Sequence, residues 1–326
     1  MRIGVNPEKS KSEKNFKYYH RIIIPVYIPN DEEPYYIKSL DVFDACLNSL
    51  FRTINFRTTA VTIINNASFP KAGKIIEKYR QKNQIDKVIN YDKNRGKVYA
   101  VVSEAKASYE PFITIADADV LFFSGWETAV FEIFNEFPSA GVVSPVPLQN
   151  LAFNKNYSVF FDNFLLNRIK HDKIVLDKDC ELFLSGMGNT ALLKRNNRKF
   201  SWKEKQYFLK KKMSAVIGAG HFVATYRKEI FNKDQPFPVW KFENGFEDTY
   251  LDEPADKLGW YRLSTPSTFA YHMGNEIDDF AANICFENNR KLKVKLVSNI
   301  KTPSKSKMPY WLKSYFFRAL KRIKKL

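Results

Sequence analysis

The stretch that decides the fold is Pro111–Phe123, PFITIADADVLFF. Most of Phe112–Ala116 and all of Val120–Phe123 are apolar. An apolar run with β-branched residues predicts a buried strand of a parallel sheet, and such sheets carry functional side chains at the carboxyl ends of their strands. The two carboxylates between the runs, Asp117 and Asp119, are therefore expected at such an end.

If the backbone stays extended here, Asp117 and Asp119 point to the same face. No Lys or Arg lies near them in the sequence, so the two anions would repel each other. A hard divalent cation that also grips phosphate oxygens would relieve this repulsion. An Asx-rich turn that closes a strand would use the same residues. Asp-Ala-Asp by itself leaves both interpretations open.

The composition is that of a globular protein. The chain has 326 residues, 44% of them hydrophobic, which is enough for one large α/β domain or two smaller ones. Its three cysteines, Cys46, Cys180 and Cys285, are too widely spaced for a disulfide framework or a paired zinc motif. The first residues lack the apolar core of a signal peptide, and no run approaches the roughly 20 apolar residues of a membrane span. These features predict a cytoplasmic protein.

The net charge of +17 suggests nucleic acid or an anionic membrane as a partner. Basic residues concentrate in residues 194–212 and from residue 291 to the end. In the first of these segments, aromatic residues such as Trp202, Tyr207 and Phe208 are interleaved with Lys and Arg. Such a mixture can bind single-stranded nucleic acid or a sugar-lipid diphosphate, or it can be a solvated face.

The last residues, 308–326, predict a basic amphipathic helix. Apolar side chains share one face of the helical wheel and basic side chains lie away from it. Such a helix can bind an anionic membrane surface, or it can dock on its own domain with solvated lysines. The apolar face comprises Leu312, Phe316, Ala319, Leu320, Ile323 and Leu326, and the basic residues are Lys313, Arg318, Lys321, Lys324 and Lys325.

Strands and helices alternate in the first third of the chain. Apolar runs predict strands at residues 20–28, 60–68 and 87–91, and helical periodicity is found at 37–51, 71–81 and 98–108. This alternation favours a parallel sheet wound by right-handed crossovers. Further on, the spacing of five apolar residues fits one face of a buried helix. They are Phe160, Phe161, Phe164, Leu165 and Ile169.

Six short motifs follow one another along residues 20–275. They are IIIPVY (22–27), IINNAS (63–68), NRGK (94–97), DAD (117–119), GFEDTYL (245–251) and YHMG (271–274). This ordered set resembles the family 2 nucleotide-sugar glycosyltransferases, which have the GT-A fold. The resemblance implies a doubly wound, mostly parallel α/β sheet with an acceptor-side extension and a C-terminal basic amphipathic helix.

The same resemblance implies a division of the chain into parts. A GT-A domain would occupy residues 20–275, with a nucleotide-binding half at 20–123 and an acceptor half at 124–275. An extension, 1–19, would precede the domain, and a basic helical tail, 276–326, would follow it.

The resemblance further implies a nucleotide-sugar pocket. Its expected residues are Pro25, Val26, Tyr27, Asn65, Arg95, Gly96, Lys97, Asp117, Ala118, Gly218 and Gly220. Asn65 stands where the family usually has an Asp that accepts the uracil imide hydrogen, and an Asn carbonyl accepts the same bond without charge assistance. From the residues alone, Asn65 and Asn66 equally predict an Asx turn, and the two glycines equally predict a tightly packed strand.

The resemblance also assigns the chemistry. Asp248, with Glu247 beside it, would be the general base, because a sugar hydroxyl must lose its proton as it attacks. The start of a helix would stabilise the carboxylate as an anion, although acidic residues are common at any helix start. The family often has an Arg six residues after the Asp. This chain has Pro254 there, which predicts a break in the helix near residues 252–254.

A divalent metal, Mn²⁺ or Mg²⁺, is implied as cofactor. Asp119 and His272 would hold it, with Asp117 as a further ligand or near the ribose. A histidine in an apolar strand is, by itself, more often a hydrogen-bonded core residue than a ligand. Mn²⁺ suits a mixed oxygen and imidazole site.

The expected function is that of an inverting glycosyltransferase. It would move a sugar from a nucleotide-sugar donor, a UDP-sugar first of all, to a hydroxyl of a glycan or lipid-linked acceptor, as in bacterial surface polysaccharide or glycoconjugate synthesis. The enzyme would be cytoplasmic, with peripheral contact to the inner face of the membrane through 308–326 and no nucleic acid partner. The alternatives are a basic nucleic-acid-binding protein and a nucleotidyltransferase. The latter would need a glycine-rich phosphate loop after the first strand, and Val26–Pro34 contains no glycine.

Overall fold

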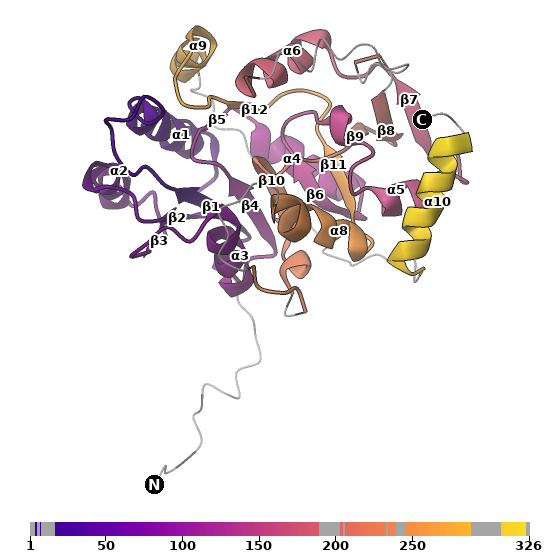
Figure 1. The fold of residues 1–326 in the computed structure, drawn as a ribbon, viewed down its shortest axis with the longest axis horizontal. Coiled ribbons are helices and arrows are strands. Elements are labelled where there is room, and N and C mark those ends of the chain that lie inside the picture. The colour runs from indigo at the N-terminus through magenta and orange to yellow at the C-terminus, as the bar shows by residue number, and fades with distance from the viewer. Residues whose placement is uncertain are drawn as a thin grey trace.

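The computed structural model describes residues 17–188, 203–204, 206–232, 234–238, 246–287 and 308–323, together with residues 4 and 7. In these residues the chain forms one ten-stranded sheet and one two-stranded sheet, flanked by helices (Figure 1). The strand order of the large sheet is β3-β2-β1-β4-β10-β6-β11-β9-β8-β7. The small sheet pairs β12 with β5.

The first four strands form a parallel half-sheet. β1 lies between β2 and β4 and runs parallel to both, and β3 extends the sheet beyond β2. Ile22, Ile23 and Ile24 of β1 are completely buried, as their uninterrupted apolar run predicts. The bounds are β1 His20–Val26, β2 Thr59–Asn65, β3 Lys87–Asn90 and β4 Phe112–Ala116.

The other strands of the large sheet have mixed directions. β10 lies antiparallel between β4 and β6, β11 runs parallel to β6, and β9, β8 and β7 continue in antiparallel order. The predicted α/β fold class, with most strands of the sheet pointing one way, is confirmed. The bounds are β6 Ala140–Ser144, β7 Ile169–Asp172, β8 Gln206–Lys210, β9 Ser214–Ile217, β10 Val223–Arg227 and β11 Tyr261–Ser264.

Helices cover both faces of the sheet. Ile22 and Ile24 belong to one buried cluster with residues of α1, α2 and α4, whereas Ile23 belongs to another with residues of α3. Alternate residues of β1 thus serve opposite faces. The predicted helices at 37–51, 71–81 and 98–108 correspond to α1, α2 and α3. The bounds are α1 Ser39–Thr53, α2 Pro70–Gln81, α3 Lys97–Ala107 and α4 Trp126–Glu136.

Shorter helices complete the described structure. They are α5 Tyr157–Asn163, α6 Asp177–Gly186, α8 Glu253–Lys257, α9 Asp279–Glu287, α10 Tyr310–Ile323, the 3₁₀ turns Gln149–Leu151 and Lys228–Phe231, and a π-helical turn at Asp248–Asp252. None of the helices within the described ranges is long and apolar enough to cross a bilayer. Cys46 and Cys180 are free and buried.

The stretch around Asp117 and Asp119 is not one extended strand. β4 ends at Ala116, the chain turns, and β5 (Val120–Phe122) pairs with β12 (Ala270–His272) in the small sheet. The turn keeps a hydrogen bond from the Val120 N–H to the Asp117 carbonyl at 3.4 Å. The two carboxylates therefore come together through a turn rather than through strand alternation.

Three other local expectations were wrong. The helix with Phe160 ends at Asn163, so Leu165 lies in a turn and Ile169 begins β7. Residues 246–257 are helical throughout: the π-helical turn passes directly into α8, which has Pro254 in its first turn, so the helix changes type there without a break. Tyr207 and Phe208 are buried in β8, and residues 194–202 and 205 of the basic segment lie outside the described part of the chain.

The C-terminal helix docks on the domain, which was one of its two predicted arrangements. α10 packs against α5, and its Phe317 and Leu320 are buried. Lys313, expected on the solvated side, is buried as well, and its Nζ donates to Ser158 Oγ at 3.2 Å. Residues 324–326 lie outside the described residues.

The contribution of the Glu127 carboxylate to the stability of the fold can be tested. This buried carboxylate, in the first turn of α4, lies 3.1 Å from His20 Nδ1 and accepts hydrogen bonds from Thr59 Oγ1 at 2.6 Å and the Asn55 N–H at 2.9 Å. Because Glu127→Ala leaves these buried groups without their acceptor, we expect it to lower the free energy of unfolding by about 3 kcal/mol. Glu132→Ala, on the exposed side of the same helix, should change it by less than about 0.5 kcal/mol in parallel urea titrations. Equal midpoints for the two variants would contradict this account.

Candidate active site

A cavity of about 420 Å³ opens where β1 and β4 end. The chain leaves both strands at their carboxyl ends here, which is where parallel α/β sheets bind ligands. The cavity is lined by Pro25, Val26, Tyr27, Tyr35, Asn66, Asn94, Gly96, Lys97, Val98, Asp117, Ala118, Phe246 and Glu247. Eight of the predicted site residues are in this set: Pro25, Val26, Tyr27, Gly96, Lys97, Asp117, Ala118 and Glu247.

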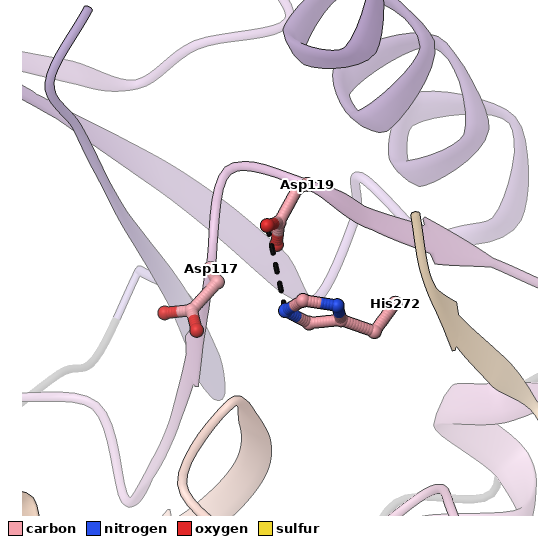
Figure 2. Close-up of side chains that lie close together, drawn as sticks. All are labelled: Asp117, Asp119 and His272. Carbon is pink, nitrogen blue, oxygen red and sulfur yellow. Dashed lines mark ion pairs between the residues drawn. The ribbon is translucent and has the colours of Figure 1, made fainter. Parts of the chain in front are cut away.

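Asp117, Asp119 and His272 lie together beside this cavity (Figure 2). The two aspartates come from the turn between β4 and β5, and His272 ends β12. One ligand atom from each residue lies within 4.8 Å of the others. His272 Nε2 is 3.4 Å from Asp119 Oδ2. The turn and the neighbouring strand thus bring the predicted metal residues into one group.

A second contact orients the His272 ring. Its Nδ1 lies 3.0 Å from the carbonyl oxygen of Gly186 at the end of α6. A carbonyl only accepts, so the Nδ1 atom carries the proton and the lone pair of a neutral ring is on Nε2, facing Asp119. A Cβ atom at Gly186 would lie 2.5 Å from the His272 carbonyl oxygen, so glycine allows this close approach.

Asp119 is a partly buried carboxylate, with 28% of its side chain exposed, and it lacks a full set of hydrogen-bond partners. Its Oδ1 atom is buried and has no hydrogen-bond partner among the described residues. Burial raises the pKa of Asp119 to about 6, the nearby His272 lowers it, and the negative charge of Asp117 raises it. An orphaned carboxylate oxygen next to an imidazole lone pair and a second carboxylate is a set of donors that fits a divalent cation.

Lys97 corrects one sequence expectation about this site. The two aspartates were expected to have no cation nearby, yet Lys97 Nζ lies 2.5 Å from Asp117 Oδ1. Lys97 is the first residue of α3, directly after Gly96, whose φ of +77° favours glycine. Asp117 is therefore partly neutralised by the protein itself, while Asp119 has its close side-chain contact with His272.

A second acidic centre surrounds Asp248. Atoms of His221, Asp248 and Asp252 lie within 4.8 Å of one another. Asp252 is buried, with Arg262 Nη2 2.8 Å from its Oδ1 atom and His221 Nδ1 3.1 Å from its Oδ2 atom. Arg262, from β11, is itself completely buried. This centre thus contains its own fixed cation.

The two carboxylates of this centre have opposite pKa shifts. Burial alone would raise the pKa of Asp252, but Arg262 and the hydrogen bond from His221 hold it below its usual range. Burial raises the pKa of Asp248, and the hydrogen bond and negative charge of Asp252 raise it further. The expected stabilisation of the Asp248 anion by the helix start is therefore outweighed by its surroundings.

The other predicted residues lie elsewhere. Asn65 forms the Asx turn that its sequence also predicted, with its Oδ1 atom accepting the Ser68 N–H at 2.9 Å, and it does not line the cavity. Arg95 contacts Asp92 at 3.1 Å and stacks on the Tyr91 ring. Gly218 and Gly220 pack tightly against Leu148, where added Cβ atoms would lie 2.2 Å and 2.9 Å from its atoms.

Sequence reasoning missed Asn66, His221, Asp252 and Arg262. Asn66 lines the cavity and clamps the 94–97 loop: its Nδ2 donates to Asn94 Oδ1 at 2.8 Å and its Oδ1 accepts the Arg95 N–H at 2.9 Å. Asp252 follows Asp248 by four residues, the spacing at which helical side chains meet, and this was an available signal. Nothing local in the sequence points from Arg262 to Asp252.

Comparison with known proteins identifies the family of the chain. A sequence profile described as Glycosyl transferase family 2 matches residues 22–199. No curated protein sequence matches the chain significantly. Among solved structures, the chain is similar to the mannosyltransferase PcManGT from Pyrobaculum calidifontis in complex with GDP-Man and Mn²⁺. The identity is 12% and the TM-score 0.44, over 77% of this chain and 55% of that chain.

Two structures from S. aureus are similar as well. TarS 1-349 has 12% identity and a TM-score of 0.46, over 77% of this chain and 59% of that one. TarS 1-349 in complex with UDP-GlcNAc has 12% identity and a TM-score of 0.46, over 82% and 64%. The chain thus spans less than two thirds of the length of these proteins.

The family profile covers more than half of the chain, from β1 to beyond α6. It includes the cavity residues of β1 and of the 94–97 loop, and also the Asp117–Asp119 turn. The GT-A fold predicted from the order of the motifs is thereby confirmed. On the strength of this match, the chain belongs to glycosyl transferase family 2.

Proposed function

We propose that the protein is a metal-assisted glycosyltransferase. It moves a sugar from a nucleotide-sugar donor, a UDP-sugar first of all, to a hydroxyl of a glycan or lipid-linked acceptor, as in surface polysaccharide or glycoconjugate synthesis. One observation carries the proposal: Lys97, Asp117 and Glu247 line the same cavity, so a phosphate-binding side and an acidic acceptor side face one space. The family match supports the class of reaction.

The donor would lie along the ends of β1 and β4. Pro25, Val26 and Tyr27 offer a surface for the nucleoside. The start of α3, with Gly96 and Lys97, suits the diphosphate, because backbone N–H groups and the positive end of the helix dipole favour an anion. Lys97 already approaches Asp117 and adds a positive charge at this point. Asn65 and Arg95, away from the cavity, would support the loop rather than contact the base.

Asp119 and His272 would hold the divalent cation, Mn²⁺ or Mg²⁺, with Asp117 as a further ligand. The orphaned Oδ1 atom of Asp119 and the lone pair on His272 Nε2 support this assignment. When bound, the ion would neutralise charge on the diphosphate as it leaves. The protein's part is to fix the donor atoms, which it does through the β5–β12 pairing and the Gly186 carbonyl.

The cation site and the activity are tested together. We expect the purified protein to hydrolyse one member of a nucleotide-sugar panel slowly, with release of the nucleoside diphosphate only when Mn²⁺ or Mg²⁺ is present. His272→Ala removes a ligand, so it should weaken Mn²⁺ binding at least about tenfold in isothermal titration calorimetry and reduce hydrolysis accordingly. The matched control is His171→Ala, an exposed histidine on β7.

Two results would count against this proposal. Mn²⁺ affinity unchanged in the His272 variant would remove the assigned metal site. Absence of hydrolysis and of nucleotide-sugar binding, together with strongly salt-dependent affinity for oligonucleotides, would favour the nucleic-acid-binding alternative.

Asp248 would be the general base, with Glu247 beside it on the cavity wall. A carboxylate with a raised pKa is a stronger base while still ionised near neutral pH. Asp252, held as an anion by Arg262 and His221, contributes to this shift. Attack by the deprotonated hydroxyl in a single displacement inverts the anomeric centre. Proton NMR of the first product would contradict the proposal if it showed retention.

The pH dependence of donor hydrolysis tests this role. Asp248 acts only when deprotonated, so activity should fall as the pH drops through its pKa, at a higher pH than for an ordinary Asp. Asp252→Asn removes the neighbouring negative charge and should shift this acidic limb to lower pH. Asp248→Asn should lower the rate by about 10² or more.

The control for the pH profile is Asp279→Asn, which removes an exposed carboxylate at the start of α9. It should leave the acidic limb where it is in the unaltered protein. If the Asp252 variant remains folded and its acidic limb lies at the same pH as in the unaltered protein, Asp252 does not raise the pKa of Asp248.

We also propose that the enzyme is cytoplasmic and touches the inner face of the membrane through residues 308–326. The outward side of α10 supports this: Trp311 and Tyr315 are each 66% exposed, and Arg318 and Arg322 continue the same stripe of the helix. Aromatic and basic side chains together suit the interface of an anionic membrane.

Vesicle co-sedimentation tests this contact. The double variant Trp311→Ser/Tyr315→Ser should pellet with phosphatidylglycerol vesicles at least about tenfold less than the unaltered chain, because the exposed aromatic anchors are gone. Tyr109→Ser, which removes an exposed aromatic far from α10 in the chain, is the matched control. Equal pelleting of all three proteins would contradict the contact.

A further inference from the structure

The turn between α5 and β7 exposes two neighbouring leucines. Leu165 is 79% exposed and Leu166 is 57% exposed. Two backbone hydrogen bonds close the turn: the Asn167 N–H donates to the Phe164 carbonyl at 3.0 Å and the Arg168 N–H donates to the Asn163 carbonyl at 3.1 Å. Two adjacent leucines exposed to water are unfavourable, and they point to an apolar environment that they enter.

A cavity of about 460 Å³ adjoins this turn. It is distinct from the donor cavity, because Arg168 of the turn is one of its lining residues and none of its lining residues is shared with that site. It is lined by Phe137, Pro138, Ser139, Asn163, Arg168, Leu209, Lys210, Lys211 and Tyr261. Three of these side chains are cationic and none is acidic.

The backbone brings two of the cations together. β7 and β8 pair antiparallel with Ile169 opposite Leu209. Arg168 precedes Ile169 in the chain and Lys210 follows Leu209, so both cations adjoin this pair. Like charges that line one cavity repel each other. Both side chains are exposed and both line the cavity. An anion between them would relieve the repulsion.

The acidic groups nearest to this cavity already have partners. The Asp162 carboxylate accepts the hydroxyl of Tyr261 at 3.1 Å. The Glu136 carboxylate accepts the Lys212 N–H at 3.4 Å, and Lys211 Nζ donates to the Glu136 carbonyl oxygen at 2.8 Å. The two neutral donors, the Tyr261 hydroxyl and the Lys212 N–H, orient the two carboxylates, while the lining of the cavity itself contains three cations and no acidic side chain.

The turn also lies beside α10. The Phe316 ring of α10 is 5.3 Å from the Phe161 ring of α5 and 6.4 Å from that of Phe164, at the beginning of the turn. Figure 1 shows α10 and α5 next to each other at one end of the molecule. The segments 164–171 and 308–323 contain no Asp or Glu. The leucines, the cavity and α10 thus belong to one basic region.

We propose that the α5–β7 turn and its cavity form a binding site for an anionic phospholipid. Leu165 and Leu166 enter the boundary between headgroups and acyl chains, and the lipid phosphate binds between Arg168 and Lys210. Charge complementarity and the pairing of an apolar tip with a cationic cavity select a lipid surface as the partner. The site deepens the membrane contact proposed for α10 and requires no transferase chemistry.

The test uses the full chain and vesicles of phosphatidylcholine with or without phosphatidylglycerol. The unaltered protein should pellet with the anionic vesicles and far less with phosphatidylcholine alone. Arg168→Gln/Lys210→Gln should weaken binding about 30-fold, since each basic residue near an anionic surface contributes about fivefold. Leu165→Ser/Leu166→Ser should weaken it more than about tenfold.

Matched controls separate this site from general charge and hydrophobicity. Leu176→Ser removes another leucine that is 57% exposed, and Lys74→Gln/Lys82→Gln removes two exposed charges from the region of α2. Both should bind vesicles like the unaltered chain. Circular dichroism melting and metal-dependent donor hydrolysis without vesicles should be the same for all these variants, which separates this site from the transferase proposal.

Two outcomes would overturn the lipid site. The first is undiminished vesicle binding by the turn and cavity variants when Trp311→Ser/Tyr315→Ser loses it, which would leave α10 as the membrane contact without this site. The second is binding of soluble glycerol phosphate that depends on Arg168 and Lys210 when vesicle binding does not, which would make the cavity a site for a free phosphate compound.

Discussion

The antiparallel pairing of β5 with β12 is the interaction on which the candidate site depends. It joins His272 to Val120 across two strands, and the Met273 N–H donates to the Asp119 carbonyl at 2.9 Å. Backbone hydrogen bonds thereby fix the distance between two ligand-bearing segments that are far apart in the chain. Without this short sheet, the turn after β4 would still carry its aspartates, but no imidazole would face them.

The two acidic centres differ in how the negative charge of their carboxylates is compensated. Each combines a histidine with two aspartates, but Asp252 is buried whereas Asp119 is partly exposed. At Asp252 the protein supplies a buried cation, Arg262, and the anion is stable within the fold. The Oδ1 atoms of Asp252 and Asp119 both lack a hydrogen-bond partner among the described residues, but the Oδ1 atom of Asp252 lies 2.8 Å from Arg262 Nη2 and that of Asp119 has no such ion pair there. That difference separates a site that is internally neutralised from one suited to an external cation.

Much of the fold followed from the sequence because its signals were local. The isoleucines of β1, the helical periodicity of α1 to α3 and the apolar run before Asp117 depend on near neighbours only. The order of the motifs then identified the family. The places where local reasoning was wrong share a cause: at Ile169, Lys313 and the turn after Ala116, contacts with distant segments decided the conformation. Lys313 of α10 is buried because its Nζ atom donates to the hydroxyl of Ser158 and lies over the Phe161 ring, both in α5.

The sequence by itself determined the alternation of strands and helices, the buried parallel half of the sheet, and which residues could carry charge at its edge. Only the tertiary structure decided which of these residues meet. Lys97 reaches Asp117, Arg262 reaches Asp252, and Asn65 turns away from the cavity that Asn66 lines. The physical reason is that periodicity reports on which side of an element a residue lies, whereas charge pairing depends on distances set by strand register and by the packing of distant elements.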